Sequence, residues 1–213
     1  MERFQGSFGG WGIAESLLVD ERAVYFTPGG KQTTIVALDR RDGKTLWKSK
    51  ALGEKTSYVS PTEIRHGGIR QIVAATTNYV FGVDPATGNM VWSSPFGKIL
   101  DAGRQIKRYD IIANSLVYRD GRLFLSNGYN HGSMMFQLND NASDVEVLWT
   151  NLDLCSQHHA FVWINNWIFG TSHPTRKWTC LDANTGKTMF SGKVPQLGLG
   201  QVISADGMIY IYD

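Results

Sequence analysis

Hydrophobic and polar residues alternate in steps of two along four stretches of the chain, and each stretch closes on an aromatic residue after a polar turn. This period of two is typical of β-strands, whereas helices repeat every three to four positions. The pattern therefore predicts four repeated pairs of antiparallel strands. The stretches are IVALDRRDGKTLW (35–47), VFGVDPATGNMVW (80–92), MMFQLNDNASDVEVLW (134–149) and TCLDANTGKTMF (179–190).

The turns of these stretches recur at a nearly constant interval. Asp39, Asp84, Asn139 and Asp182 open the four turns and lie 45, 55 and 43 residues apart. Repeats of about 40 to 45 residues that contain alternating strands are typical of propeller blades. The sequence thus predicts an all-β fold, a β-propeller of four-stranded antiparallel blades.

One partial propeller domain over residues 1–213 is predicted, with about four and a half blades. An open ring would expose strand edges, which proteins avoid. We therefore expect a fragment of a larger ring, whose remainder belongs to the same longer polypeptide. The predicted blades are residues 11–52, 56–96, 109–152 and 156–194, with the start of a fifth at 198–213.

Each of the clearest turns combines an aspartate with a glycine. The aspartate side chain can accept hydrogen bonds from N–H groups of its own turn, and glycine adopts left-handed backbone angles at little cost. These residues are predicted to encode the hairpins locally. The aspartates are Asp39, Asp84 and Asp182, and the glycines are Gly43, Gly88 and Gly186.

The aromatic residues that close the repeats are too large to be buried within one four-stranded blade. Each can bury about 150 to 250 Å² against a neighbour, roughly 4 to 6 kcal/mol before entropy is subtracted. Docking of one blade onto the next is therefore their predicted role. The four residues are Trp47, Trp92, Trp149 and Phe190.

Composition supports the all-β prediction and excludes some partners. The chain has 23 Gly, 7 Trp and 8 Tyr with only 6 Pro, and its net charge is +2 with basic and acidic residues interspersed. No polybasic face for nucleic acid is expected. No apolar run is long enough for a transmembrane segment, and the opening MERFQGSFGG has no signal-peptide core. Cys155 and Cys180 are expected to be ordinary thiols rather than a disulfide.

The A-L-D-x-x-x-G-K-x-x-W pattern of residues 37–47, with echoes at 83–92 and 181–190, resembles the pyrroloquinoline-quinone-like (PQQ-like) β-propeller repeat family. The family includes quinone-dependent alcohol and sugar dehydrogenases as well as non-catalytic scaffolds of bacterial outer-membrane assembly. The resemblance therefore implies the fold more specifically than the function. It also implies rings of seven or eight blades and an extracytoplasmic location, periplasmic or exported.

A ligand site in a propeller is expected at the central axis, which the first strand of each blade lines. Aligning these strands places Glu15, Val59, Asn114, His159 and Gln201 in equivalent positions. Four of the five are polar, and a buried polar group needs a partner. These polar residues indicate either a solvated axial channel with structural hydrogen bonds or a ligand site.

A single insertion interrupts the spacing of the first strands. About ten extra residues lie between blades 2 and 3, in the segment 97–108, which contains Arg104 and Lys107. The segment is either a solvated surface loop or a gate that contacts an acidic group at the channel mouth. No metal site is predicted, since His158 and His159 are adjacent and point to opposite faces of a strand.

Two functions remain open from the sequence, and the first is favoured. In the first, the propeller is a rigid binding or scaffold module for a protein, peptide or carbohydrate. Candidate contacts are Tyr129, Trp163 or Trp167, although alternation places Trp167 in the core. Alternatively, it is part of a PQQ-dependent alcohol or sugar dehydrogenase. The resemblance would then imply PQQ with Ca²⁺ at the axis, for which Glu15 and Asn114 are candidate ligands. No catalytic residue is assigned.

Overall fold

The chain forms a row of antiparallel sheets in the computed structural model, which describes residues 1–96, 111–158 and 161–212. Four sheets have four strands, a fifth has two, and within each sheet the strands follow one another in chain order. The prediction of an all-β propeller of four-stranded blades is confirmed. A 3-10 turn, η1 (Glu2–Phe4), precedes the sheets, and no helix of the described residues could span a membrane.

The strands have the following bounds. Blade 1 contains β1 (Leu18–Val19), β2 (Ala23–Phe26), β3 (Val36–Asp39) and β4 (Thr45–Lys48). Blade 2 contains β5 (Thr62–His66), β6 (Ile69–Ala75), β7 (Tyr79–Val83) and β8 (Met90–Pro95). Blade 3 contains β9 (Val117–Arg119), β10 (Arg122–Asn127), β11 (Gly132–Leu138) and β12 (Val145–Asn151). Blade 4 contains β13 (Phe161–Ile164), β14 (Trp167–Ser172), β15 (Lys177–Asp182) and β16 (Thr188–Gly192), and blade 5 contains β17 (Gln201–Ala205) and β18 (Met208–Tyr212).

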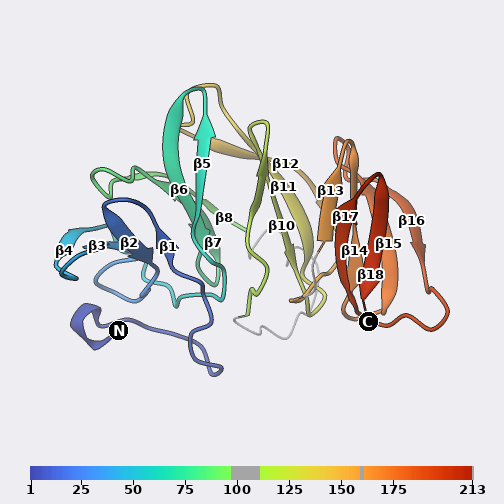
Figure 1. The fold of residues 1–213 in the computed structure, drawn as a ribbon, viewed down its shortest axis with the longest axis horizontal. Coiled ribbons are helices and arrows are strands. Elements are labelled where there is room, and N and C mark those ends of the chain that lie inside the picture. Colours follow the sequence, from blue (N-terminus) through green and yellow to red (C-terminus); the bar gives the residue numbers. More distant parts are fainter. Residues whose placement is uncertain (97–110, 159–160, 213) are drawn as a thin grey trace.

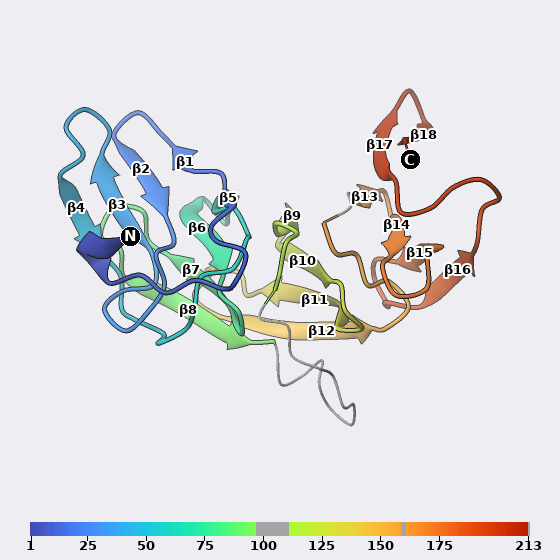
Figure 2. The ribbon, with the colours of Figure 1, turned by 90° about the horizontal axis from the view of Figure 1, so that it is seen from below.

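The blades follow one another around an open arc (Figures 1 and 2). Seen from below, the first strands β1, β5, β9 and β13 lie on the concave side, and the fourth strands β4, β8, β12 and β16 lie on the convex side (Figure 2). Three apolar clusters fill the spaces between successive blades 1 to 4. The hydrophobic core of blades 1 to 4 is therefore a series of blade-to-blade layers.

A β-bulge lies at the same place in all four complete blades, in the pairing of the third and fourth strands. The register shifts between Ala37 and Leu38 in blade 1, and equivalent shifts follow Gly82, Met135 and Cys180. The residue paired just before each shift is the closing aromatic. Bulges re-aim side chains and increase local twist, so this one orients the aromatic toward the next blade.

Blade 5 leaves the outer face of blade 4 only partly covered. Trp167 is 43% exposed, so the expectation that it belongs to the core is wrong. Its hollow, of about 450 Å³, is lined mainly by residues of blade 4, with Gly207 and Ile209 of blade 5. Two strands supply too little surface to bury a tryptophan here. Cys155 and Cys180 do not form a disulfide with each other, as predicted.

Candidate functional site

The three Asp-Gly turns share one hydrogen-bonding scheme. In the first, the N–H of Arg41 donates to Asp39 Oδ1 at 2.8 Å and the N–H of Gly43 donates to the Asp39 carbonyl at 2.9 Å. Asp84 and Asp182 accept equivalent bonds from their own turns. Gly43, Gly88 and Gly186 have φ values of 69°, 77° and 70°. The turn thus presents its glycine on the edge of each blade.

Two tryptophans dock onto the turn of the following blade. Trp47 Nε1 donates to the Pro85 carbonyl at 3.0 Å, and Trp149 Nε1 donates to the Ala183 carbonyl at 3.1 Å. The rings pack against turn glycines: a Cβ built on Gly88 would lie 2.4 Å from Trp47 Cε3. The same relation holds between Gly186 and the Trp149 ring. The Asp-x-x-x-Gly turn is therefore also a socket for the preceding tryptophan.

Trp92 reaches the next blade by a relay. Its Nε1 donates to Gln71 Oε1 at 2.9 Å, and Gln71 Nε2 donates to the Ala142 carbonyl at 2.6 Å. The blade 3 turn opens on Asn139 and has no glycine, and Ala142 takes the left-handed conformation with φ of 53°. The glutamine spans the different shape of this turn. No feature of the repeat pattern indicates Gln71.

Phe190 does not dock as the tryptophans do. Its side chain is 49% exposed, and a Cβ built on Gly207, the nearest glycine turn of blade 5, would meet nothing within 4 Å. The predicted blade-docking role of Phe190 therefore stays a prediction. The described part of blade 5 contains only its first two strands, and the sockets used by Trp47 and Trp149 lie between the third and fourth strands.

The axial positions predicted from the sequence divide into two groups. Glu15, Val59 and Asn114 each lie three residues before the first strand of their blade, whereas Gln201 is the first residue of β17 and is exposed. His159, Arg104 and Lys107 lie outside the described residues. The described members therefore do not form one register around the axis.

The polar side chains in these positions are used within the protein. Both carboxylate oxygens of Glu15 accept hydrogen bonds from Thr27, one from its N–H at 2.9 Å and one from its hydroxyl. Burial raises the pKa of Glu15, and the Thr27 bonds oppose that shift. Asn114 is buried, and its Nδ2 donates to the Ser156 carbonyl at 2.9 Å across the junction of blades 3 and 4. These groups act as structural links.

A chain of serines joins the first three blades at the next position along. The Ser16 N–H donates to Ser60 Oγ at 2.9 Å, and the Ser60 N–H donates to Ser115 Oγ at 3.2 Å. Each serine directly follows one of Glu15, Val59 and Asn114, so the alignment of first strands contained the signal for this ladder. The ladder was not predicted, because the candidates in that alignment were charged, imidazole and amide side chains.

An aromatic hollow lies at the same end of the blades. It encloses about 440 Å³, and Trp11 on its rim is 79% exposed. Gln157 Nε2 hydrogen-bonds the Tyr129 hydroxyl, and the Tyr129 ring lies 5.0 Å from that of His173, which orients the tyrosine. The lining residues are Trp11, Ala14, Tyr58, Ile111, Ala113, Tyr129, Gln157 and His158.

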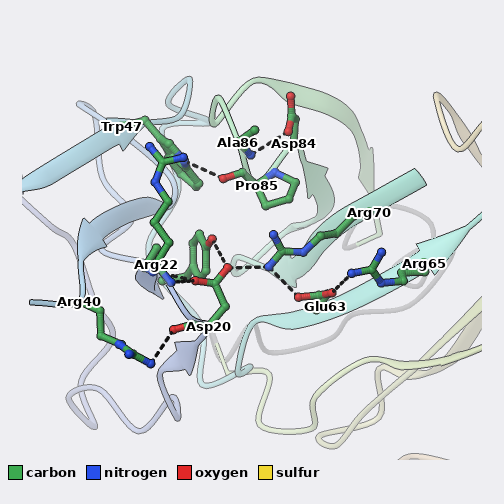
Figure 3. A network of polar contacts seen from close by, with 12 residues as sticks. Asp20, Arg22, Arg40, Trp47, Glu63, Arg65, Arg70, Asp84, Pro85 and Ala86 are labelled. Atoms are coloured by element: carbon green, nitrogen blue, oxygen red, sulfur yellow. Dashed lines mark hydrogen bonds and ion pairs between the residues drawn. The ribbon is translucent and has the colours of Figure 1, made fainter. Parts of the chain in front are cut away.

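An ion network joins blades 1 and 2 at the opposite end of the sheets (Figure 3). Arg70 Nη2 lies 2.6 Å from Asp20 Oδ2 and 2.8 Å from Glu63 Oε2. Burial alone would raise the pKa of Asp20. Its carboxylate accepts hydrogen bonds that hold this pKa well below the usual range, from Arg70, Ala23, Tyr25 and Arg22. Burial, and then the bond to Asp20, raises the pKa of Tyr25 to about 12. The network therefore requires ionised Asp20.

Replacing Asp20 with asparagine is expected to lower the free energy of unfolding by roughly 2 kcal/mol at pH 7, because charged hydrogen bonds to Arg70 are lost. The pKa of Asp20 is lower in the folded protein than in the unfolded chain, where it is about 3.9. Ionised Asp20 therefore stabilises the folded state above about pH 4, and this stabilisation is lost as the pH falls toward the folded-state pKa. The difference between wild type and Asp20→Asn should thus shrink below about pH 4. Urea titrations at pH 7 and pH 3 measure it. Asp42→Asn, in an exposed pair with Lys44, should change little.

Comparison with known proteins gives the family. A family model described as "Outer membrane protein assembly factor BamB" matches residues 2–191. The chain belongs to this family of PQQ-like repeat propellers. The predicted resemblance is confirmed. No curated protein matches the sequence.

Solved structures of the same fold include a BamB protein, a designed protein and alcohol dehydrogenases. BamB from Moraxella catarrhalis is 16% identical with a TM-score of 0.61, and the match covers 92% of this chain and 54% of that one. Quinohemoprotein alcohol dehydrogenase from Comamonas testosteroni is 12% identical with a TM-score of 0.56, covering 98% and 40%. The computationally designed Ika8 protein is 12% identical with a TM-score of 0.55, and the match covers 92% of this chain and 54% of that one. The chain spans about half the length of the BamB structure.

The described axial residues of this PQQ-like propeller do not fit a quinone with calcium. Calcium takes six to eight oxygen ligands, but the described residues at the predicted axial positions offer only the Glu15 carboxylate, which accepts two bonds from Thr27, and the amide oxygens of Asn114 and Gln201. In the part of the chain that the structure describes, no group of three His, Cys, Asp or Glu side chains could hold a metal ion. The accessible feature at this end is instead aromatic.

Proposed function

We propose that this chain is part of a non-catalytic scaffold that binds a protein partner outside the cytoplasm. The family description places its relatives in outer-membrane protein assembly, and we propose the same process here. The partner would insert an apolar side chain of an extended segment into the aromatic hollow around Trp11 and Tyr129. Aromatic residues carry much of the binding energy at protein interfaces.

One observation carries the proposal. At the end of the blades where an axial ligand would enter, the polar groups of Glu15, Asn114 and Ser60 are engaged in hydrogen bonds within the protein. Among the described residues, the hollow open to an incoming molecule there is mainly apolar and aromatic, with Trp11 79% exposed. Such a surface favours apolar side chains over a polar quinone with its metal ion.

A photo-crosslinking amino acid at position 11 of the full-length protein, in its own cell envelope, is expected to capture a component of the outer-membrane assembly machinery. Trp11→Ala should then weaken binding of that purified component at least fivefold, because the anchor of the hollow is lost. The measurement is the dissociation constant by calorimetry. Trp167→Ala, a second half-exposed tryptophan remote from the hollow, is the matched control and should leave the constant within twofold.

A titration with PQQ and Ca²⁺ provides the opposing arm. The scaffold proposal expects no tight binding and no dye-linked alcohol oxidation by the full-length protein. Tight quinone binding with turnover would overturn it in favour of the dehydrogenase. Equal loss of partner binding in Trp11→Ala and Trp167→Ala would also contradict the proposal, since the hollow would then have no special role.

A further inference from the structure

Successive blades are linked at the end opposite the aromatic hollow, and the link differs at each junction. Between blades 1 and 2 it is the ion network, in which Arg70 lies between Asp20 and Glu63 (Figure 3). Between blades 2 and 3, His66 lies 3.2 Å from the Tyr118 hydroxyl through Nδ1 and 3.1 Å from the Asn139 carbonyl through Nε2. In both junctions the protein supplies both sides of the link.

The junction between blades 3 and 4 reverses the charge of the first. Asp20 is the residue before the turn that joins the first two strands of blade 1, and Arg119 holds that place in blade 3. The Arg119 guanidinium lies over the Trp163 ring, 5.9 Å from its centroid, and Nη1 donates at 3.4 Å to the carbonyls of Trp163 and Asn165. An arginine thus stands where the equivalent junction has a carboxylate.

A second guanidinium lies beside the first. Arg122 Nη1 donates to Asn184 Oδ1 at 2.7 Å. Among the described residues, Asp120 supplies the carboxylate that pairs with Arg119, 3.6 Å from Nε and with its side chain 91% exposed. Such an exposed pair contributes little and is screened by salt. The two arginines are therefore incompletely neutralised by the described residues.

These side chains line a hollow of about 330 Å³, the Arg119–Arg122 pocket. Its lining carries two arginines against one aspartate, whereas the hollow at the first junction carries three arginines and three carboxylates. Amide side chains and one face of an indole complete the wall. The lining residues are Arg119, Asp120, Arg122, Trp163, Asn165, Asn166, Ala183 and Asn184.

We infer that the Arg119–Arg122 pocket binds a carboxylate side chain of an acidic peptide segment in a protein partner. A guanidinium has five N–H donors in a planar fork that matches a carboxylate. The molecule already uses this pairing at the equivalent first junction, where Arg70 is bound by Asp20 and Glu63. A carboxylate of the partner would neutralise these arginines as the carboxylates of Asp20 and Glu63 neutralise Arg70 within the chain.

The pocket is separate from the aromatic hollow. Arg122 is the first residue of β10, and Tyr129 follows the other end of the same strand. Six residues of strand span about 20 Å. The inference therefore does not rest on the proposed function, and either site can be disabled without the other.

The test uses the peptide acetyl-Gly-Glu-Glu-Gly-amide and its counterpart with two glutamines, each labelled with a dye for fluorescence anisotropy, at about 20 mM salt. The acidic peptide is expected to bind at least fivefold more tightly than the amide peptide, and about 300 mM salt should weaken it severalfold. The double variant Arg119→Gln with Arg122→Gln should lose at least fivefold in affinity for the acidic peptide. Far-UV circular dichroism establishes that the variant is folded.

Arg65→Gln is the matched control, because Arg65 lines the equivalent hollow of the first junction and is paired with Glu63. Its affinity for the acidic peptide should stay within twofold of wild type. Equal binding of the two peptides would overturn the inference. So would a loss of affinity in Arg65→Gln as large as that in the double variant. Unchanged affinity in both the single variant Arg122→Gln and the double variant would overturn it as well. Displacement of the peptide by inorganic phosphate at lower concentration than by acetate would overturn the assignment to a carboxylate.

Discussion

Gly88→Ala is expected to destabilise the protein by about 3 kcal/mol, although it adds a single methyl group. At φ of 77° an L-residue costs roughly 1 to 2 kcal/mol. The new Cβ would also lie 2.4 Å from Trp47 Cε3 and 2.6 Å from Cδ2. The indole must shift, which strains the interface and weakens its hydrogen bond to Pro85, and overpacking of this kind costs roughly 1 to 3 kcal/mol more.

Gly43→Ala separates the two contributions. Gly43 has a similar φ of 69° in an equivalent turn, but a Cβ built there meets nothing within 4 Å. Its expected cost is therefore the backbone part alone, about 1 kcal/mol. Urea unfolding followed by circular dichroism measures both variants, with unchanged slopes showing that only stability has changed. Equal losses in the two variants would show that the socket around Trp47 contributes nothing.

Much of the fold could be predicted because each repeat encodes it locally. Asp39 and Gly43 determine the turn by bonds within five residues, and the step-of-two alternation before them identifies the strands. The β-bulge beside each aromatic was not predicted. It depends on one extra residue in the fourth strand, such as Leu46, which the pattern of hydrophobic residues does not distinguish from a regular strand.

The candidate sites were harder to predict because their partners are distant in the sequence. Arg70 and Asp20 are fifty residues apart and belong to no shared motif, so only the arrangement of blades 1 and 2 brings them together. The same is true of Arg119 and Trp163. The axial prediction rested on the type of residue alone. It located Glu15 and Asn114 near the expected end of the blades but could not show that hydrogen bonds within the protein already engage them.

Residues at equivalent repeat positions consequently have different roles. Asp20 and Arg119 precede the same turn of their blades, yet one is neutralised within the chain and the other faces a pocket with a surplus of positive charge. The repeat maintains the backbone geometry, which needs only the turn and the aromatic contact. The side chains at the junctions are then able to vary, and specific recognition by a propeller is expected at these variable positions.

The same divergence should be measurable among the closing aromatics. Trp149→Ala is expected to lower the free energy of unfolding by roughly 4 kcal/mol, because it empties a largely buried site and removes the bond from Nε1 to the Ala183 carbonyl. Trp149→Phe, which keeps most of the ring, should cost about 1 to 2 kcal/mol through the lost hydrogen bond and the smaller ring. Circular dichroism in urea avoids the loss of a fluorophore.

Phe190→Ala tests whether position in the repeat or actual burial determines the effect. Phe190 pairs with Cys180 as Trp149 pairs with Met135, just before the same bulge, but its side chain is 49% exposed. If burial decides, Phe190→Ala should cost about 1 kcal/mol, well below the range for a fully buried aromatic. A loss as large as that of Trp149→Ala would mean that Phe190 is covered in the folded protein in solution. That result would assign it the docking role that its place in the repeat predicts.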